Sequence, residues 1–384
     1  MQINHRALIL ELSFSPSMQN HKARLYPNKS QKRELFRQFA VHCELYNYCL
    51  TEKIETYEKT GKSPSCFDQI KANVPKFKNN CNVASMQQTV RRLDKTFGSF
   101  FRRVKKGEKP GFPRYKKTFK SLDFRKGDGA KIIGSRLRIQ NVGSIKMVNH
   151  RNVVDYTRVT IKYEHGDWYA IFSVESVPVT YEPSDKAIGI DFGLQTFAAT
   201  SDGVKYFSPK PLRENIKALT KAQSKRDKAP KGSEERRQRN KALRYLHRYI
   251  NNVRKDWNHK LSRKLVKENG TIVIENLSLK DLQSEISNIN RAYRDVAWGE
   301  FVSMLDYKAE NAGRLVFKVN PAYTSQTCQC GAITPHTLKE RTFLCGQCGG
   351  TADRDVNAAR NILALGLQGR PLKLVKPVSG ARSP

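Results

Sequence analysis

Two segments of this sequence place an acidic residue at the end of an otherwise apolar, strand-forming run. Residues 188–194 read IGIDFGL and residues 271–277 read TIVIENL. Because successive side chains of a strand point to opposite faces, Asp191 faces away from the isoleucines of its segment, and Glu275 shares a face with Val273. A carboxylate among apolar neighbours costs free energy unless something positive meets it. The two segments therefore predict strands that bring carboxylates to a cation-binding site.

A third acid, Asp355, stands directly before the helical pattern VNAARNIL. At this position its carboxylate is expected to cap the helix, and the paired alanines of the pattern would let the helix approach a sheet closely. Asp353 competes with Asp355 for the role of third acid, and Asp355 is preferred because it directly abuts the helix. Taken singly, each acid has a simpler interpretation: Asp191 in a turn, Glu275 in an ion pair at a strand end, and Asp355 as a helix cap alone.

Together the three acids predict a metal-dependent nuclease site. Three carboxylates that converge without counter-charge would repel one another and take up protons. Two Mg²⁺ ions relieve that repulsion, and such a pair serves phosphodiester cleavage, in which one ion lowers the pKa of the attacking water and the other stabilises the leaving oxygen. A fold that separates Asp191, Glu275 and Asp355, or pairs them with lysines and arginines, would contradict this interpretation.

The net charge of the chain indicates a polyanionic partner. Its 70 lysine and arginine residues and 35 aspartate and glutamate residues leave a formal charge of +35 and a pI near 10. Self-repulsion of this size opposes a compact fold unless a polyanion neutralises it, and nucleic acid can do so with release of counterions. Residues 209–267 are expected to be helical and hold 20 lysines and arginines against 5 acids, which favours a phosphate-facing surface over a merely solvated one. A ribosomal or other structural RNA-binding protein would share this charge.

The apolar runs and the cysteines bear on the compartment. No run approaches the roughly 18 apolar residues of a membrane span, and Glu11 interrupts the apolar stretch near the N-terminus, so neither a membrane partner nor a secretion signal is expected. Four of the 8 cysteines crowd into 21 positions. Such clustering in a large basic protein predicts a metal site in a reducing cytosol rather than a disulfide framework. The other four are expected to be small core residues.

The chain is expected to contain a β-rich first half with a helical insertion and a second half that starts near Lys186. Residues 22–27 predict a short strand, and apolar residues then recur at helical spacing over 30–57 and 85–104. From about 121 to 178, strand-like segments alternate with turns. This order is compatible with a small barrel that holds a helical unit.

Several long strings, in their order along the chain, resemble the TnpB family of insertion-sequence proteins and, through it, the compact type V CRISPR effectors. The resemblance extends from about Lys22 to Gly366, whereas residues 1–20 have no clear counterpart. The strings that carry it are KARLYPNKSQKRELFRQFAVHCELYNYCL, SMQQTVRRLDKTFGSFFRRVKKGEKPGFPRYKK, IGIDFGLQTFAATSDG, WNHKLSRKLV, IVIENLSLKDL, YRDVAWGEFVSMLDYKAENAG, YTSQTCQCG, FLCGQCG and DRDVNAARNIL.

The resemblance implies a multidomain protein of the α+β and α/β classes. It would contain a wedge β-barrel with a helical recognition insertion, followed by an RNase H-like (RuvC) nuclease domain with an inserted zinc ribbon. The implied limits are 1–21 for an N-terminal extension, 22–30 and 106–182 for the wedge barrel, 31–105 for the helical recognition unit, 183–319 and 353–367 for the nuclease domain, 320–352 for the zinc ribbon, and 368–384 for a disordered tail.

In function, the resemblance implies an RNA-guided DNA endonuclease. Its partners would be a guide RNA from the transposon end and a double-stranded DNA target that carries a short flanking motif, and its place would be the nucleoid of a prokaryotic cytoplasm. By carry-over, Asp191, Glu275 and Asp355 are the catalytic acids and the ligands of two Mg²⁺ ions. A nuclease-inactive RNA-guided repressor is disfavoured because all three acids are present. A DNA transposase with an RNase H-like fold is disfavoured because a zinc ribbon lies between the second and third acids.

The clustered cysteines Cys328, Cys330, Cys345 and Cys348 correspond in this family to a structural Zn²⁺ site. The family's ribbon opens with two residues between its first cysteines, but here only one residue separates Cys328 and Cys330. Two residues let the chain turn back and aim both sulfurs at one tetrahedral ion. With one residue the two sulfurs must bind the ion from a shorter, more constrained loop. The alternative is a ribbon held by packing without zinc. His336 is a candidate substitute ligand, or otherwise a loop residue.

Contacts with a guide–target hybrid are expected to be basic and numerous, because such a hybrid is recognised by its backbone and shape. Besides residues 210–267, the predicted contacts are Gln87, Gln88, Arg91, Arg92, Arg102, Arg103, Lys105, Lys106, Arg114, Lys116 and Lys117. The two glutamines are expected to read base edges of the flanking motif, since glutamine pairs with adenine in the major groove. Each of these residues is equally well explained as solvated surface. Tyr26, Tyr46, Phe112 and Tyr115 are candidates for stacking on bases, with core packing as the alternative.

Overall fold

The chain forms two compact units, Met1–Ser176 and Val177–Pro384. The structure is a computed structural model. It describes residues 18–77, 81–276, 295–320, 322–335 and 340–368. Within these ranges no helix has the length and apolar character needed to cross a bilayer.

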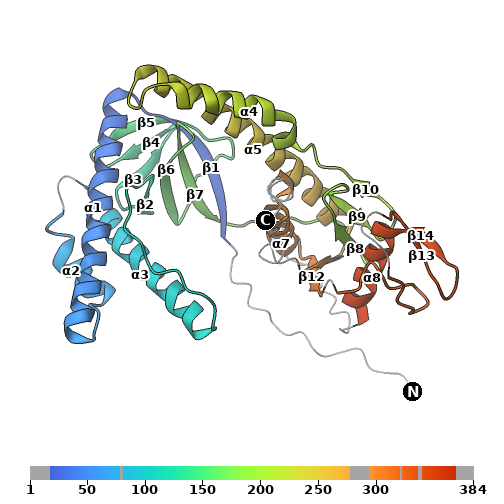
Figure 1. The fold of residues 1–384 in the computed structure, drawn as a ribbon. Coiled ribbons are helices and arrows are strands. Elements are labelled where there is room, and N and C mark those ends of the chain that lie inside the picture. The colour runs from blue at the N-terminus through green and yellow to red at the C-terminus, as the bar shows by residue number, and fades with distance from the viewer. Residues whose placement is uncertain (1–17, 78–80, 277–294, 321, 336–339, 369–384) are drawn as a thin grey trace, which may run out of the picture. The chain divides into compact units, whose positions relative to one another are not determined.

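The first unit is built on a seven-stranded antiparallel sheet (Figure 1). In pairing order its strands are β2 (Ser121–Arg125), β6 (Arg158–Glu164), β7 (Asp167–Glu175), β1 (Met18–Tyr26), β5 (Gly143–Val148), β4 (Arg136–Ile139) and β3 (Ala130–Ile133). Only residues 126–129 join the two edge strands, β2 and β3, so the edges lie together and the sheet curves into a nearly closed barrel. In β7 every second side chain is buried, as the alternation of strand side chains requires.

Three helices are inserted between β1 and β2. They are α1 (Lys29–Thr60), α2 (Cys66–Asn73) and α3 (Val83–Lys105). Asn28 and Gln31 form a capping box at the start of α1, and Asn82 caps α3 by accepting the backbone N–H of Ser85 at 2.8 Å. Buried side chains of α1, α3 and the sheet share one core. The predicted combination of helices with a barrel-like sheet is thereby confirmed.

The second unit contains a five-stranded sheet of mixed direction. Its order is β10 (Lys205–Tyr206), β9 (Ala198–Thr200), β8 (Ala187–Phe192), β11 (Thr271–Glu275) and β12 (Leu315–Val319). The strands β8, β11 and β12 run parallel, whereas β9 and β10 pair antiparallel. Hairpin strands therefore follow β8 on one side, and longer helical connections lead to the parallel strands on the other.

Helices cover both faces of this sheet. They are α5 (Glu234–Glu268), α7 (Trp298–Asn311) and α8 (Arg354–Gln368), whereas α4 (Pro211–Lys228) packs against α5. The isoleucines of β8 and β11 share a core with apolar residues of α5 and α7. The opposite face, which carries Gly189 and Val273, packs against α8.

The basic region predicted to be helical over 209–267 consists of two helices rather than one. The chain breaks between α4 and α5 at residues 229–233, where the guanidinium of Arg236 donates to the carbonyl oxygen of Ala229 at 2.7 Å. A small cluster of Leu219, Leu243 and Ile250 holds the two helices together. Most other side chains of the pair remain at least partly exposed.

Candidate active site and metal centre

The register of the parallel strands places Asp191 and Glu275 next to each other. Ile190 of β8 pairs with Ile274 of β11, so the residue that follows each isoleucine leaves the sheet at the same edge. Both isoleucines point into the core shared with α5 and α7. Asp191 and Glu275 therefore lie on the opposite face, which confirms the face assignment made from the sequence.

Helix α8 lies very close to this face because two glycines allow it. A Cβ added to Gly189 would lie 2.1 Å from the carbonyl oxygen of Ala359, and one added to Gly366 would lie 2.4 Å from Cγ1 of Val273. Real Cβ contacts are not this short, so any larger residue at either position would push helix and sheet apart. These glycines are not among the site residues expected from the sequence. A glycine in the interior of a β-strand, such as Gly189, often marks close backbone approach and is the signal that could have found it.

Asp355 lies in the first turn of α8, and the residue that caps this helix is Asp353. Its Oδ1 atom accepts the backbone N–H groups of Asp355 and Val356, each at 3.1 Å, while Oδ2 accepts from Lys205 Nζ at 2.6 Å. The prediction that Asp355 caps the helix is therefore wrong, because the helix begins at Arg354, two residues before the expected start at Val356. Burial would raise the pKa of Asp353, but its bonds to Lys205 and to these N–H groups lower it below the usual value.

The three carboxylates interact electrostatically. Burial raises the pKa of Asp191 well above its usual value, the charges of Glu275 and Asp355 raise it further, and Arg354 acts in the opposite direction. Burial also raises the pKa of Glu275, against a hydrogen bond of 3.0 Å from the hydroxyl of Thr324. Glu275 and Asp355 are 8% and 9% exposed. The fold thus brings the three acids, far apart in sequence, near enough for the charges of Glu275 and Asp355 to act on Asp191.

Two arginines stand against Asp355, contrary to the expectation of a site without counter-charge. Nη2 of Arg354 lies 3.2 Å and Nη1 of Arg341 lies 3.7 Å from Asp355 Oδ1. The reason is local: Arg354 is the neighbour of Asp355 on α8, and Arg341 lies just before a short hairpin next to that helix. These guanidinium groups offset part of the charge of Asp355, whereas burial first, and then the charges of Glu275 and Asp355, raise the pKa of Asp191. This incomplete compensation is compatible with divalent cations at the site.

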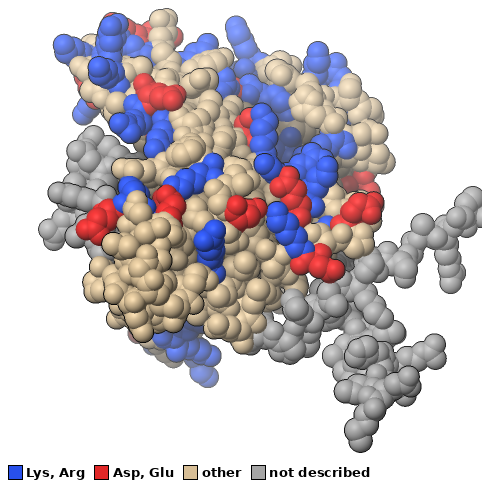
Figure 2. All heavy atoms as spheres, turned by 90° about the vertical axis from the view of Figure 1, so that its right-hand side faces the viewer, with Lys and Arg blue, Asp and Glu red and all other residues tan. Residues whose placement is uncertain are grey.

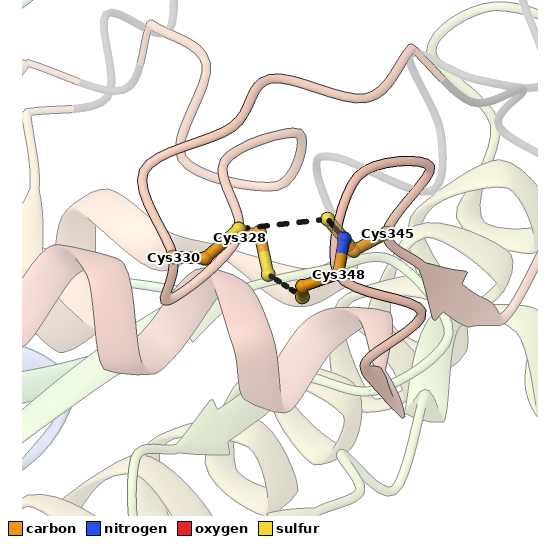
Figure 3. Close-up of side chains that lie close together, drawn as sticks. All are labelled: Cys328, Cys330, Cys345 and Cys348. Carbon is orange, nitrogen blue, oxygen red and sulfur yellow. Dashed lines mark hydrogen bonds between the residues drawn. The ribbon is translucent and has the colours of Figure 1, made fainter.

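The four clustered cysteines form a site with the dimensions of a metal centre (Figure 3). Their sulfur atoms all lie within 4.8 Å of one another, with Sγ–Sγ distances of 3.6 Å between Cys328 and Cys348 and 3.7 Å between Cys330 and Cys345. Tetrahedral zinc with Zn–S bonds of about 2.3 Å separates its sulfurs by about 3.8 Å. The one-residue spacing therefore does not prevent Cys328 and Cys330 from facing the second pair. His336 lies outside the described residues.

The second cysteine pair is carried by the hairpin of β13 (Thr342–Leu344) and β14 (Thr351–Asp353). The backbone N–H of Cys345 donates to the carbonyl oxygen of Gly350 at 2.9 Å, and Gly349, with φ of +69°, closes the turn. β14 leads directly into α8, so the cysteine cluster and the third acid are joined by a few residues of backbone (Figure 1).

The predicted nucleic-acid contacts differ in their freedom to meet a ligand. Along the second half of α3 and the segment that follows, the basic side chains are exposed: Arg102, Arg103, Lys105, Lys106, Arg114, Lys116 and Lys117. Gln87, Gln88, Arg91 and Arg92 are half-buried in the first half of α3. Arg92 already donates to Asp123 Oδ2 at 2.6 Å and lies over the ring of Phe119.

The candidate stacking residues also differ in their exposure to solvent. Tyr46 is a core residue with 1% exposure, whereas Tyr26, Phe112 and Tyr115 are each more than half exposed. Phe112 packs edge-to-face against Phe100, with ring centroids 5.5 Å apart. On the face shown in Figure 2, lysine and arginine side chains lie mainly in the upper part and acidic ones in a band across the middle.

Comparison with known proteins gives the family. The chain is 31% identical to the Escherichia coli (strain K12) protein named "Putative RNA-guided DNA endonuclease InsQ", over 93% of this chain and 96% of that protein. It is also 31% identical to a Streptomyces pristinaespiralis protein named "Putative RNA-guided DNA endonuclease", over 90% of this chain and 89% of that protein. The chain belongs to the TnpB family. The resemblance read from the sequence is confirmed.

Other known proteins match part of the chain or its fold. The CRISPR-associated endodeoxyribonuclease Cas12f1 of Sulfoacidibacillus thermotolerans is 33% identical over 51% of this chain and 49% of its own. Among solved structures, a Cas12f1–sgRNA–target DNA complex superimposes with a TM-score of 0.54 and 17% identity, over 86% of this chain and 82% of that one. The mini-RNA-guided endonuclease CRISPR-Cas_phi3 gives 0.51 and 12%, over 93% of each chain. These two structures show a shared fold.

Three sequence families of this group match successive parts of the TnpB chain. Residues 18–62 match a "Helix-turn-helix domain", residues 170–285 a "Probable transposase", and residues 298–362 a "Cas12f1-like, TNB domain". In this chain the first of these ranges contains the strand β1 and the 32-residue helix α1 rather than a helix–turn–helix pair. The last contains α7, β12, the cysteine cluster and most of α8.

Proposed function

We propose that this protein is an RNA-guided DNA endonuclease that hydrolyses phosphodiester bonds at Asp191, Glu275 and Asp355. The observation that carries the proposal is the convergence of these acids, two from adjacent parallel strands and one from the helix that covers them. The sheet order β10-β9-β8-β11-β12, with β9 antiparallel to β8, supports an RNase H-like (RuvC) domain around the site.

The three acids would hold two Mg²⁺ ions, for which their oxygen ligands and mutual repulsion are suited. When bound, such a pair lowers the pKa of an attacking water and stabilises the leaving oxygen. The chain's own contribution is positional. Gly189 and Gly366 let α8 approach the sheet, and the cap by Asp353 leaves the carboxylate of Asp355 available to the site.

The proposed partners are a guide RNA from the transposon end and a double-stranded DNA target next to a short flanking motif. Their support is the charge of +35, the names of the relatives and the exposed basic residues of α3, α4 and α5. Contacts with phosphates would fix the hybrid in place without reading its bases. The site of action would be the nucleoid of a prokaryotic cytoplasm.

The experiment uses the protein together with the RNA that co-purifies with it from cells carrying the DNA on both sides of its gene. That RNA is sequenced, and the complex is incubated with plasmids that place the guide-matched sequence beside randomised flanking bases. We expect a homogeneous RNA that ends in transposon-end sequence, and double-strand breaks with Mg²⁺ but not with EDTA.

Other outcomes would favour other functions. Sequence-specific binding without cleavage would indicate the RNA-guided repressor. Strands joined to new DNA rather than released ends would indicate a transposase, the activity in the description of one matching family. A well-folded protein that carries no RNA at low salt would contradict the guide-dependent mechanism.

We further propose that Cys328, Cys330, Cys345 and Cys348 hold one structural Zn²⁺ ion. Elemental analysis of the purified complex should find about one zinc per chain, and Cys345→Ser should lose it. Cys66→Ser, which changes a half-buried cysteine of the first unit, is the matched control and should retain the metal. A zinc-free protein with full activity would indicate that packing alone holds this segment.

A further inference from the structure

The carboxylate of Glu275 is held by a residue from the segment that precedes the cysteine cluster. The hydroxyl of Thr324 lies 3.0 Å from Glu275 Oε1, and both side chains are buried, at 4% and 8% exposure. An ionised carboxylate only accepts hydrogen bonds, so the hydroxyl is the donor when Glu275 carries its charge. The bond occupies one side of Oε1, and among the described residues no donor bonds to Oε2.

Thr324 is presented by a tight turn. The carbonyl oxygen of Tyr323 accepts the backbone N–H groups of Gln326 and Thr327, each at 3.0 Å, and the hydroxyl of Thr327 at 2.9 Å. Tyr323 itself has φ of +62°, a conformation that residues other than glycine adopt only when their surroundings impose it. The turn is therefore held in one shape at the position just before Thr324.

Helix α8 fixes the same turn from its other side. Nδ2 of Asn361 donates to the carbonyl oxygens of Thr324 at 2.8 Å and Thr327 at 2.7 Å, and Nδ2 of Asn357 donates to Thr327 at 2.9 Å. Oδ1 of Asn361 accepts from Nε2 of Gln329, which stands between the first two cysteines, at 3.1 Å. Asn357 and Asn361 are 2% and 8% exposed, so these are buried, directional bonds.

These contacts form a continuous path from the cysteine cluster to the proposed catalytic site. Gln329 donates a hydrogen bond to Asn361, and Asn361 donates to the backbone of the turn. The turn thereby places the hydroxyl of Thr324 within hydrogen-bond distance of Glu275. The asparagines stand on the helix that also carries Asp355, so one helix fixes the position of two of the three acids. Neither asparagine is needed for a helix as such, because asparagine is a poor helix former.

We infer that Thr324 is a positioning residue for the nuclease reaction, which orients Glu275 toward a divalent cation, and that Asn361 holds Thr324 in place for this role. The inference rests on the proposed function, because it concerns the same site. Residues that orient a metal ligand in this way alter metal affinity by roughly 10- to 100-fold when they are replaced.

The test compares Thr324→Val, which replaces the hydroxyl by a methyl group, with Thr324→Ser, which keeps the hydroxyl. For the valine variant we expect the Mg²⁺ concentration for half-maximal cleavage to rise about 10-fold, with the rate largely recovered at saturating Mg²⁺. The serine variant should stay within about 2-fold of the unmodified protein. Asn361→Asp, which keeps the size of the side chain but loses its donors, should shift the Mg²⁺ requirement in the same direction as Thr324→Val.

A second readout does not depend on activity. Binding of Mn²⁺ to the RNA complex is followed by electron paramagnetic resonance of the free ion. The sites on the RNA are the same in every variant and cancel in the difference. Thr324→Val should lose or weaken the tightest Mn²⁺ site of the protein, and Glu275→Gln should have the same effect. Thr271→Val, a buried threonine at the opposite end of β11 from Glu275, is the matched control and should leave Mn²⁺ binding and cleavage unchanged.

The outcomes separate this inference from the proposed function. If the unmodified complex does not cleave DNA, or Asp191→Asn cleaves as well as it does, the proposed function fails. If Asp191→Asn is inactive but Thr324→Val keeps the unmodified Mg²⁺ requirement and Mn²⁺ binding, the positioning role is refuted. Should the valine variant fail to fold, Thr324→Ala places no methyl group against the carboxylate and carries the same prediction.

Discussion

His42 in the first unit is fully buried and Asp191 in the second is half-buried, yet the surroundings of these two ionisable side chains are opposite. The ring of His42 lies between two hydroxyls, with Nδ1 2.7 Å from Thr89 Oγ1 and Nε2 3.1 Å from Ser85 Oγ. Burial lowers its pKa to about 4, so the ring is neutral at neutral pH. Asp191 instead has carboxylates as its neighbours, and its pKa is raised.

The difference shows how to separate polar residues that stabilise the fold from those that act on a partner. A buried group whose hydrogen-bond partners lie within the chain contributes to stability. A buried group whose neighbours repel it costs stability, and it is retained where a ligand from outside relieves the repulsion. The same contrast separates two arginines of α3: Arg92 is bonded to Asp123, whereas Arg103 is exposed.

The largest predicted effect is at the carboxylates. Asp191→Asn keeps the shape of the side chain but removes its charge, so the site should lose a metal ligand. Metal stabilisation of the transition state amounts to several kcal/mol, and we expect cleavage by the RNA complex to fall by about 10³-fold or more. Binding of RNA and of target DNA should remain nearly unchanged, as a gel-shift titration would show.

Asp306→Asn is the matched control for this change. Asp306 stands on α7 of the same unit and is paired with Lys318 at 2.8 Å on the surface. Its replacement removes the same charge without touching the site, and cleavage should stay within about 2-fold because exposed pairs contribute little. If Asp191→Asn still cleaved DNA with Mg²⁺ present, Asp191 would not be a metal ligand. Repulsion from neighbouring carboxylates would then not mark a residue that acts on a partner.

The part of the site that could be predicted from sequence is the part that depends on local regularity. The faces of Asp191 and Glu275 follow from strand alternation, and the cysteines follow from their spacing. The cap of α8 was assigned to Asp355 instead of Asp353 because the start of a helix depends on which residue finds partners, here Lys205 from a distant strand. Arg341 as a neighbour of Asp355 also could not be foreseen, since its contact arises from tertiary structure.

The fold shows the same limit. Apolar spacing located α1 and α3 to within a few residues, because both helices bury one face. It did not place the break between α4 and α5, where solvent-exposed basic residues leave little periodic signal. Nor did it identify Gly189 as a contact point, because the helix that it meets lies far ahead in the sequence.

The next largest effect is expected for Gly189→Ala. This change tests whether close packing of α8 on β8 holds the three mutually repelling carboxylates in place. The new Cβ would meet the backbone of Ala359 at 2.1 Å, so α8 must move away from β8. We expect the free energy of unfolding to fall by about 3 kcal/mol and cleavage to fall with it. Gly98→Ala, in the open on α3, should leave both unchanged or slightly raise stability. Chemical denaturation of both variants checks the pair, and equal stabilities would contradict the close approach.

The pH dependence of stability tests the other residue of the comparison, His42, whose ring nitrogens both have hydrogen-bond partners within the chain. The folded pKa of His42, about 4, lies below that of an unfolded histidine, near 6.5. Between these values the unfolded chain binds a proton that the folded chain does not. Stability should therefore be fully present above about pH 6.5 and decline as the pH falls toward 4.

The loss attributable to His42 should be about 2–3 kcal/mol over that range. His42→Gln, which cannot take up a proton, should remove this part of the slope, whereas the exposed His150→Gln should not. The contribution of the carboxylates to the slope is the same in the unmodified protein and in both histidine variants, so it cancels when their slopes are compared. Identical slopes for His42→Gln and the unmodified protein would mean that the ring is not held neutral.

The smallest predicted effects separate the two arginines of α3. Arg103→Ala removes one exposed cation, so affinity for the guide–target hybrid should fall a few-fold at most. The slope of log affinity against log salt should become shallower by about one, while the unfolding transition stays in place. Arg92→Ala should do the reverse, because it leaves the half-buried Asp123 without its guanidinium: stability should fall by about 1 kcal/mol or more, with little change in the salt slope. If both variants changed the salt slope equally, Arg92 would also contact phosphate, although it is already bonded to Asp123. A hydrogen-bond partner within the chain would then no longer distinguish structural residues from binding residues.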